Sequence, residues 1–171
     1  MNAPFEAQRM SELLDQFVNA FNADDLDRVM SCFADGAQYL HGDGRHYSGK
    51  AQIRAALSPQ FARAYGTMRF EEHDRILDEG ARKAVIRWTC HHDLAAAKWY
   101  SFGVFARNAL ARLTVGRRCR WQGLDVLHFD AAGKIRGKFT YAPLARPQLE
   151  PDGLATRSLM QSVGATSQTY V

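Results

Sequence analysis

The hydrophobic pattern of this chain changes its period once, near Gly66. Before that residue, apolar side chains recur every three or four positions, most regularly over 5–21, which is typical of helices that bury one face. After it, apolar and polar side chains alternate over 68–77, 83–94 and 118–129, which is typical of strands. Helices followed by consecutive strands predict an α+β domain in which a sheet curls over the helices.

Short turn sequences divide the first half of the chain into elements. Either aspartate of the sequence NADD can cap a second, shorter helix, and Gly36 is suited to the left-handed position that ends it. Residues 37–41 alternate as a first strand. The sequence GDGRHYSG is read as loop, and a third helix opens at Ser48 or Gly49. Pro59 is expected to break or kink that helix.

Alternate residues of a strand share one face of the sheet. In the strand over 68–77, this rule places Phe70 and Ile76 on one face and Leu77 on the other. The turn DAAGK then leads to a last strand over 135–142.

Composition and cysteine spacing indicate the class of protein. With 171 residues and 46% apolar content, the chain fits one domain over 1–142, followed by an extension over 143–171. No apolar run is long enough to span a membrane, and the first residues do not resemble a signal peptide, so we expect a cytoplasmic location. Cys32, Cys90 and Cys119 lack CxxC spacing, which indicates neither a disulfide framework nor a zinc site.

The net charge of +4 is unevenly distributed, because 98–120 holds six bases and no acid. Such a run can accompany an anionic ligand, nucleic acid or a membrane surface, although most are solvated faces. Nucleic acid is not an expected partner, since the segment lacks a helix-turn-helix rhythm, an aromatic ribonucleoprotein motif and metal-knuckle cysteines. The inserted basic loop, 98–117, is longer than a hairpin needs, and 104–113 can form a short helix within it.

Two stretches, FVNAFNADDLDRVMSCFADGAQYLHGDGRHYSGKAQI and WQGLDVLHFDAAGKIRGKFTYA, together with the order of elements, resemble the nuclear transport factor 2-like superfamily. The resemblance is strongest to its SnoaL-like and ketosteroid-isomerase-like bacterial members and covers roughly 8–142. It implies a cone in which a curved antiparallel or mixed sheet wraps three helices around a deep apolar pocket, commonly in a homodimer formed through the sheet. Members include isomerases, polyketide cyclases, dehydratases, epoxide hydrolases and non-catalytic proteins, so the fold alone does not decide the activity.

The ketosteroid-isomerase pattern matches this chain in part. It places His41 where that family has a proton-shuttling carboxylate. It places Asp125 where the family has a protonated aspartate that donates to the developing oxyanion. The second oxyanion donor, a tyrosine of the first helix, corresponds to Phe17. In SnoaL-type cyclases, Asp125 matches the acid/base aspartate of the cavity.

The residues themselves also suggest a proton-transfer site. A histidine needs little pKa adjustment to act near neutral pH, and a buried carboxylate such as Asp125 needs a partner. His41, His92 and Asp125 all point inward in the predicted phases, so His41 and Asp125 form a candidate dyad in which the carboxylate fixes the imidazole tautomer. Alternatively, His41 is a pocket-rim residue and Asp125 holds a backbone amide or an arginine. The expected ligand-binding walls are Phe17, Tyr39, Ile86, Trp88, Trp121 and Leu127.

The leading hypothesis is acid/base catalysis on a hydrophobic, carbonyl-bearing or polycyclic small molecule, as isomerase, cyclase or dehydratase (lyase), without a cofactor. His41 is the base and Asp125 its partner or the acid. A non-catalytic ligand-binding or dimerisation module is the alternative, and a basic-loop protein that docks an anionic partner is the third. A metal site at 91–93 is not expected, because His91 and His92 diverge to opposite faces of a strand.

Overall fold

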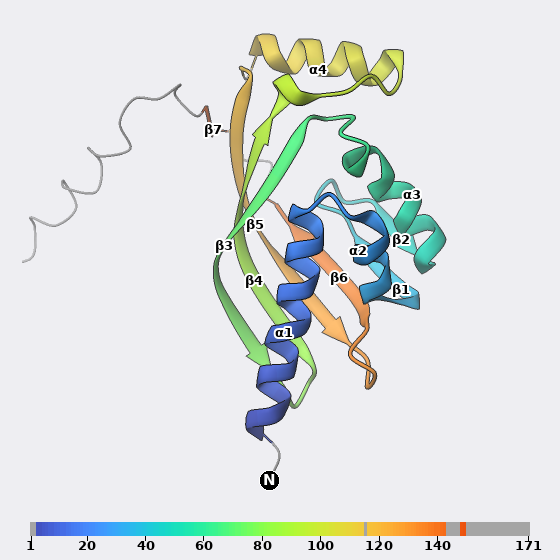
Figure 1. Cartoon of the computed structure of the whole chain (residues 1–171), viewed down its shortest axis with the longest axis vertical. Helices are drawn as coiled ribbons and strands as arrows, with labels where there is room; N and C mark the ends of the chain where they lie inside the picture. The colour runs from blue at the N-terminus through green and yellow to red at the C-terminus, as the bar shows by residue number, and fades with distance from the viewer. Residues whose placement is uncertain (1–2, 115, 143–147, 150–171) are drawn as a thin grey trace, which may run out of the picture.

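The computed structural model describes residues 3–114, 116–142 and 148–149, and shows a curved, unclosed sheet around helices (Figure 1). The elements in chain order are α1 (Ala3–Asn22), α2 (Leu26–Cys32), β1 (Phe33–Leu40), β2 (His46–Ser48), α3 (Gly49–Phe61), β3 (Thr67–Asp78), β4 (Lys83–Asp93), the 3-10 turn η1 (Leu94–Ala96), α4 (Phe102–Thr114), β5 (Arg118–Phe129), β6 (Ile135–Tyr141) and β7 (Gln148–Leu149). This arrangement confirms the predicted α+β cone. In the described part of the chain, no helix is both long and apolar enough to cross a membrane.

The strands are ordered β2-β1-β6-β5-β4-β3 across the sheet, and β7 pairs with the start of β5. All neighbouring pairs are antiparallel except β1 and β6, which run parallel. The sheet is therefore mixed. Apart from the two residues of β7, the predicted extension over 143–171 lies outside the described residues.

The core lies between α1, α2 and α3 and the concave face of the sheet. Its members come from the helical stripes and from the inward positions of the strands, as the two periodicities predict. Those with no exposed surface are Leu14, Ala20, Val29, Phe33, Ala37, Ile53, Cys90 and Leu127.

The structure corrects the predicted end of the second helix. Asp25 is its N-cap, and its carboxylate accepts a hydrogen bond of 2.9 Å from the Arg28 amide. The helix ends at Cys32, and Phe33 is already extended, with φ −83° and ψ 145°. Gly36 lies inside β1 rather than in a left-handed cap, because the chain passes from helix to strand without a turn.

Two further predictions between β1 and β3 need correction. The sequence assigned to loop contains β2, whose three residues pair with the end of β1. Pro59 does not break α3, which continues to Phe61. Because Pro59 lies only two residues before the end of the helix, the missing N–H and the ring affect little of it.

A bulge in β3 reverses the face on which its side chains lie. The register to β4 shifts between Glu72 and Asp74, so residues after the bulge change sides. Leu77 therefore packs against the core, whereas Ile76 is 68% exposed. The predicted grouping of Ile76 with Phe70 is wrong for this reason.

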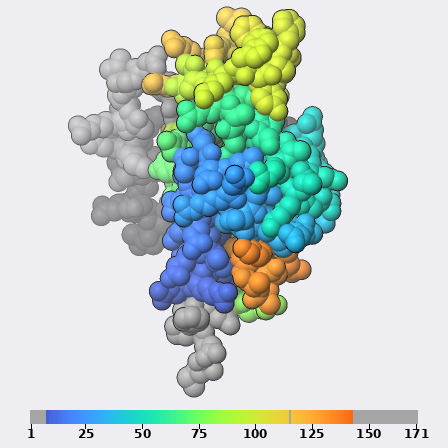
Figure 2. Space-filling model, turned by 45° about the vertical axis from the view of Figure 1, so that its right-hand side comes forward, coloured from blue at the N-terminus to red at the C-terminus, as the bar shows by residue number. Residues whose placement is uncertain are grey.

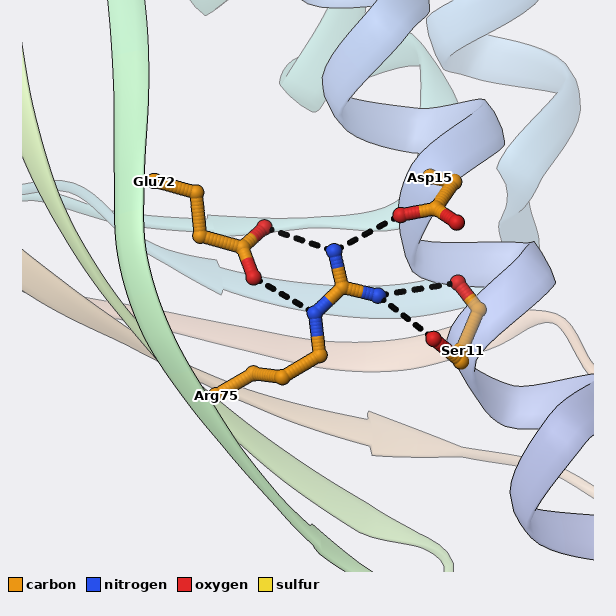
Figure 3. Close-up of polar contacts among 4 residues, drawn as sticks. All are labelled: Ser11, Asp15, Glu72 and Arg75. Atoms are coloured by element: carbon orange, nitrogen blue, oxygen red, sulfur yellow. Dashed lines mark hydrogen bonds and ion pairs between the residues drawn. The ribbon is translucent and has the colours of Figure 1, made fainter.

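The same bulge allows β3 to hold α1 in place. In a regular strand, Glu72 and Arg75 would point to opposite faces, but here both point toward α1 (Figure 3). The Arg75 guanidinium bonds Glu72 at 2.5 and 2.9 Å, Asp15 at 2.6 Å and the Ser11 hydroxyl at 2.7 Å. The Ser11 carbonyl accepts a further bond of 3.2 Å, so each guanidinium nitrogen has an acceptor.

Gly66 marks the change of period and is constrained by its backbone. Its φ is +98°, and a Cβ there would lie 2.1 Å from the Asp93 carbonyl oxygen. A side chain at this position would push β3 away from the end of β4. The position therefore requires glycine for both conformation and space.

We predict that Gly66→Ala lowers the free energy of unfolding by about 2–4 kcal/mol, from left-handed strain and backbone overlap together. Gly36→Ala is the matched control, because a Cβ there would meet nothing within 4 Å and its φ is ordinary; we expect a change within about 0.5 kcal/mol. Urea unfolding measures both variants. Equal midpoints for Gly66→Ala and the wild type would contradict this account.

Candidate functional site

A cavity of about 590 Å³ lies between the concave face of the sheet and the helices. Its volume is in the range of sites for drug-sized molecules. Five of the six predicted wall residues line it: Phe17, Tyr39, Ile86, Trp88 and Trp121. Leu127 does not line it, because its side chain is fully buried in the core.

Asp125 lies in the cavity wall beside two polar side chains of β6. Thr140 is its cross-strand partner, and Lys138 lies diagonally opposite on the same face. The Oδ1 atom of Asp125 accepts hydrogen bonds from Lys138 Nζ at 2.7 Å and from Thr140 Oγ1 at 2.6 Å. Lys138 Nζ also donates to Thr140 Oγ1 at 2.7 Å. We call these three residues the Asp125 cluster.

The Asp125 cluster is an ion pair with little access to water, since Asp125 and Lys138 are 5% and 6% exposed. In such a site, charges interact more strongly than in water, and desolvation is costly unless each charge is paired. Among the described residues, none donates a hydrogen bond to the second carboxylate oxygen of Asp125. Because the residue lines the cavity, this oxygen and the ammonium can act on a bound ligand.

Two aromatic residues of the cavity wall carry hydrogen-bond donors. Burial, and to a lesser extent the Asp125 carboxylate, raise the pKa of Tyr39 well above its usual range, so its phenol stays protonated. Lys138 Nζ lies 5.1 Å from the centre of the Tyr39 ring. Trp88 Nε1 is buried and has no hydrogen-bond partner among the described residues, which is uncommon for an indole N–H.

His41 lines the cavity but bonds Asp43 rather than Asp125. It follows the last residue of β1, in a turn where its amide donates to the Arg45 carbonyl. The turn places Asp43 Oδ1 2.9 Å from His41 Nδ1, and the His41 side chain is 42% exposed. The predicted dyad with Asp125 is thus replaced by a dyad with Asp43, because the strand ends one residue too early to carry His41 to the floor of the cavity.

Asp43 is suited to orient this imidazole. Partial burial acts to raise its pKa, but bonds from the Arg45 amide and the His41 ring outweigh it and lower the pKa below the usual value. The carboxylate therefore stays ionised. The Asp43 amide also faces His41 Nδ1, at 3.3 Å, but the carboxylate oxygen is closer, at 2.9 Å, and favours the tautomer with the proton on Nδ1. In that tautomer, Nε2 carries the lone pair and is the basic atom.

His92 also lines the cavity, yet both of its ring nitrogens face protein atoms. Nε2 bonds the Tyr65 carbonyl, which requires the proton on Nε2, and Nδ1 lies 3.9 Å from Cys119 Sγ. Burial lowers the pKa of His92, although the contact with the Tyr65 carbonyl opposes this shift. The neutral ring therefore packs the wall against Trp121, with centroids 5.1 Å apart, and this geometry favours a structural role.

Sequence reasoning missed Lys138 and Thr140, although it required a partner for Asp125. A regular hairpin that pairs Phe129 with Ile135 would place Phe139 opposite Asp125. A register shift between His128 and Phe129 moves Thr140 to that position instead. The one available signal was a lysine at the centre of a strand that also carries Arg136.

The predicted helix over 104–113 is present as α4, and it closes one end of the cavity. The Asn108 amide donates to the Ala64 carbonyl at 2.7 Å, and the Arg112 guanidinium donates to the Leu94 carbonyl at 2.6 Å. The Arg107 guanidinium lies 4.4 Å above the Tyr65 ring. The helix is thus held to the domain by its polar side chains.

No group of three His, Cys, Asp or Glu side chains in the described ranges is placed to hold a metal ion. His91 faces away from the cavity and bonds Glu71 across the outer face at 3.0 Å. His73, also on that face, bonds Thr89 at 2.7 Å.

Comparison with known protein families identifies this architecture. The model of the SnoaL-like domain matches residues 14–137, which is most of the chain. The chain belongs to the SnoaL-like family. This confirms the resemblance found in the sequence and, with the structural neighbours, places the domain in the NTF2-like fold.

Similar solved structures share the fold at low identity. The enzyme SalBIII, described as epoxide hydrolase/cyclase-like and linked to pyran ring formation in the polyether salinomycin, has a TM-score of 0.65 and 14% identity, covering 88% of this chain and all of the other. A putative polyketide cyclase from Xanthomonas campestris pv. campestris has a TM-score of 0.57 and 19% identity, covering 81% and 93%. A putative polyketide cyclase from Pseudomonas putida KT2440 has 0.56 and 18%, covering 77% and 90%. No curated protein gives a significant match.

We predict that Lys138→Met costs about 3–5 kcal/mol of stability, because it leaves the Asp125 carboxylate buried without a counter-charge. The double variant Asp125→Asn with Lys138→Met removes both charges, so it should be more stable than Lys138→Met alone. Urea unfolding of the wild type, the two single variants and the double variant measures the coupling. Additive losses would show that the two charges do not interact.

We predict that His92 makes the protein less stable in mild acid. Its pKa is lowered in the folded state, so below about pH 6.5 the unfolded chain binds more protons and stability falls as the pH falls. His92→Gln keeps an N–H donor for the Tyr65 carbonyl but does not titrate. Urea unfolding from neutral to mildly acidic pH should show a smaller loss in His92→Gln than in the wild type. Burial also lowers the pKa of His128, but this residue is present in both proteins, so its contribution to the two losses is the same. Equal losses of stability would therefore contradict the prediction.

Proposed function

We propose that this protein is a cofactor-independent acid/base enzyme that acts on a hydrophobic, carbonyl-bearing or polycyclic molecule in the cavity. The observation that carries the proposal is the Asp125 cluster. It is an ion pair shielded from bulk water, and it faces a cavity with mostly apolar walls. Replacing such a pair by apolar residues often leaves stability unchanged or improves it, so its presence beside a cavity points to use on a ligand.

The two polar groups of the cavity, the dyad of His41 with Asp43 and the Asp125 cluster, are assigned different roles. His41, oriented by Asp43, is the base that removes a proton from the carbon next to the substrate carbonyl. The negative charge then develops on the carbonyl oxygen, where the Lys138 ammonium and the protonated Tyr39 phenol stabilise it. Asp125 acts through Lys138, because the hydrogen bond between them holds the ammonium in position.

The resulting enolate leads to three related reactions. Return of the proton to another carbon gives an isomer, attack of the enolate carbon on a second carbonyl closes a ring, and loss of a β-hydroxyl gives a dehydrated product. In the last two cases, protonated His41 gives its proton back to oxygen: to the new alkoxide on ring closure, and to the leaving hydroxyl on dehydration. The described activities of the fold neighbours, polyketide cyclase and epoxide hydrolase/cyclase-like enzyme, support the ring-closing alternative.

A second candidate function is ligand binding without catalysis. It is favoured by Phe17, which offers no hydrogen-bond donor to the cavity, and by the exposure of the His41 side chain to solvent. Dimerisation through the sheet and a cytoplasmic location stay predictions from the sequence.

We predict that the protein exchanges the α-protons of bicyclic ketones such as 1-tetralone for deuterium in heavy water, and that His41→Ala lowers this rate by about a hundredfold or more. His46→Ala is the matched control, because His46 is exposed on β2 and does not line the cavity. Mass spectrometry of the ketone measures the exchange, and calorimetry measures binding. Binding without exchange would support the second candidate, and equal rates for His41→Ala and His46→Ala would overturn the role of His41.

A further inference from the structure

Exposed large apolar side chains gather in one segment of the described chain. Eight such side chains are more than a third exposed, and six of them lie between 99 and 113. These six are Trp99 (69%), Tyr100 (49%), Phe102 (75%), Phe105 (53%), Leu110 (61%) and Leu113 (85%). A concentration of this kind marks an interaction surface, whereas single exposed apolar residues do not.

The polar and apolar sides of α4 are reversed relative to an ordinary surface helix. Asn108 is buried, and Asn108 and Ala111 line the cavity on the inner side. Phe102, Leu110 and Leu113 lie on the opposite side, at spacings that place them on one helical face. We call the six exposed side chains the α4 apolar face. Four of the six lie on α4 itself, which is too many for a helix whose outer side only meets water.

The sequence that carries this face is basic. The segment 98–120 contains six bases and no acid. Lys98 and Arg107 lie on either side of the exposed aromatic residues in the sequence, and Arg117 follows the helix. Two copies of the chain meeting through this face would bring the two basic segments together, so a partner of negative charge fits better. Aromatic and leucine side chains flanked by bases are the pattern of helices that lie in the surface of an anionic bilayer.

The position of α4 in the molecule suits a flat surface. It lies at the end of the cone opposite the N-terminus of α1, and forms that end in the space-filling view (Figures 1 and 2). It can therefore contact a planar surface without other described elements intervening.

We propose that the α4 apolar face docks this protein on anionic lipid bilayers. Trp99, Phe102 and Leu113 insert among the headgroups, and the exposed bases Lys98 and Arg117 contact the lipid phosphates and carboxylates. Since α4 also closes the cavity, docking brings one wall of the cavity to the bilayer. The docking does not depend on the chemistry proposed for the cavity.

The test is co-sedimentation of the full chain with phosphatidylcholine vesicles that contain or lack phosphatidylserine. We expect binding to the anionic vesicles, little binding to the neutral ones and weakening by salt. Phe102→Ser with Leu113→Ser should reduce the affinity at least about tenfold, because two apolar side chains no longer insert. Both side chains are largely exposed, so an unchanged melting temperature is expected for this variant.

Two controls make the result decisive. Ile76→Ser removes another largely exposed apolar side chain, 68% exposed on β3, and should bind vesicles like the wild type. Lys98→Gln with Arg117→Gln should weaken binding and reduce its dependence on salt. Equal binding by the wild type and Phe102→Ser with Leu113→Ser would overturn the proposal. Absence of vesicle binding by the wild type would also overturn it. One such case is a dimer, seen by sedimentation velocity, that dissociates in Phe102→Ser with Leu113→Ser.

Discussion

The cavity exists because the strands of the sheet are longer than the helix that covers them. β3, β4 and β5 contain 12, 11 and 12 residues, and at about 3.3 Å per residue they span nearly 40 Å. The 20 residues of α1 span about 30 Å and cover only one part of the curved face (Figure 1). The remaining part is enclosed by α3 and α4, and the space between them is the cavity. Arg75 of β3 fixes this arrangement. Its guanidinium bonds Ser11 and Asp15 of α1 as well as Glu72 of β3, and so joins the strand to the helix.

The polar residues of the site differ in how far water reaches them. The Asp125 cluster is buried, so water screens the interaction of its charges with a bound ligand less than it would at the surface. The dyad of His41 and Asp43 lies at the mouth, where solvent weakens the pairing but where protons exchange freely with water. The buried cluster is thus suited to stabilise charge, and the solvent-exposed dyad is suited to transfer protons.

Much of the fold could be predicted from the sequence, and less of the site. The helical stripe of α1, the cap at Asp25 and the alternation in β4 and β5 indicated the right elements and the right inward residues, including Asp125, Trp88 and Trp121. The resemblance to SnoaL-like proteins indicated the cone. The partner of Asp125 could not be predicted, because the bulge between β5 and β6 shifts every residue of β6 by one position relative to a regular hairpin.

The sequence by itself determined most of the helical and extended segments and most of the residues that face inward, because these depend on local period and on short-range caps. Only the tertiary structure decided which inward residues meet. Bulges in β3 and at the β5–β6 pair place Arg75 against α1 and Lys138 against Asp125, and the early end of β1 gives His41 to Asp43. A bulge or a strand end changes the face or partner of every later residue while leaving the local pattern almost unaltered, so its effect becomes visible only when the neighbouring strand is in place.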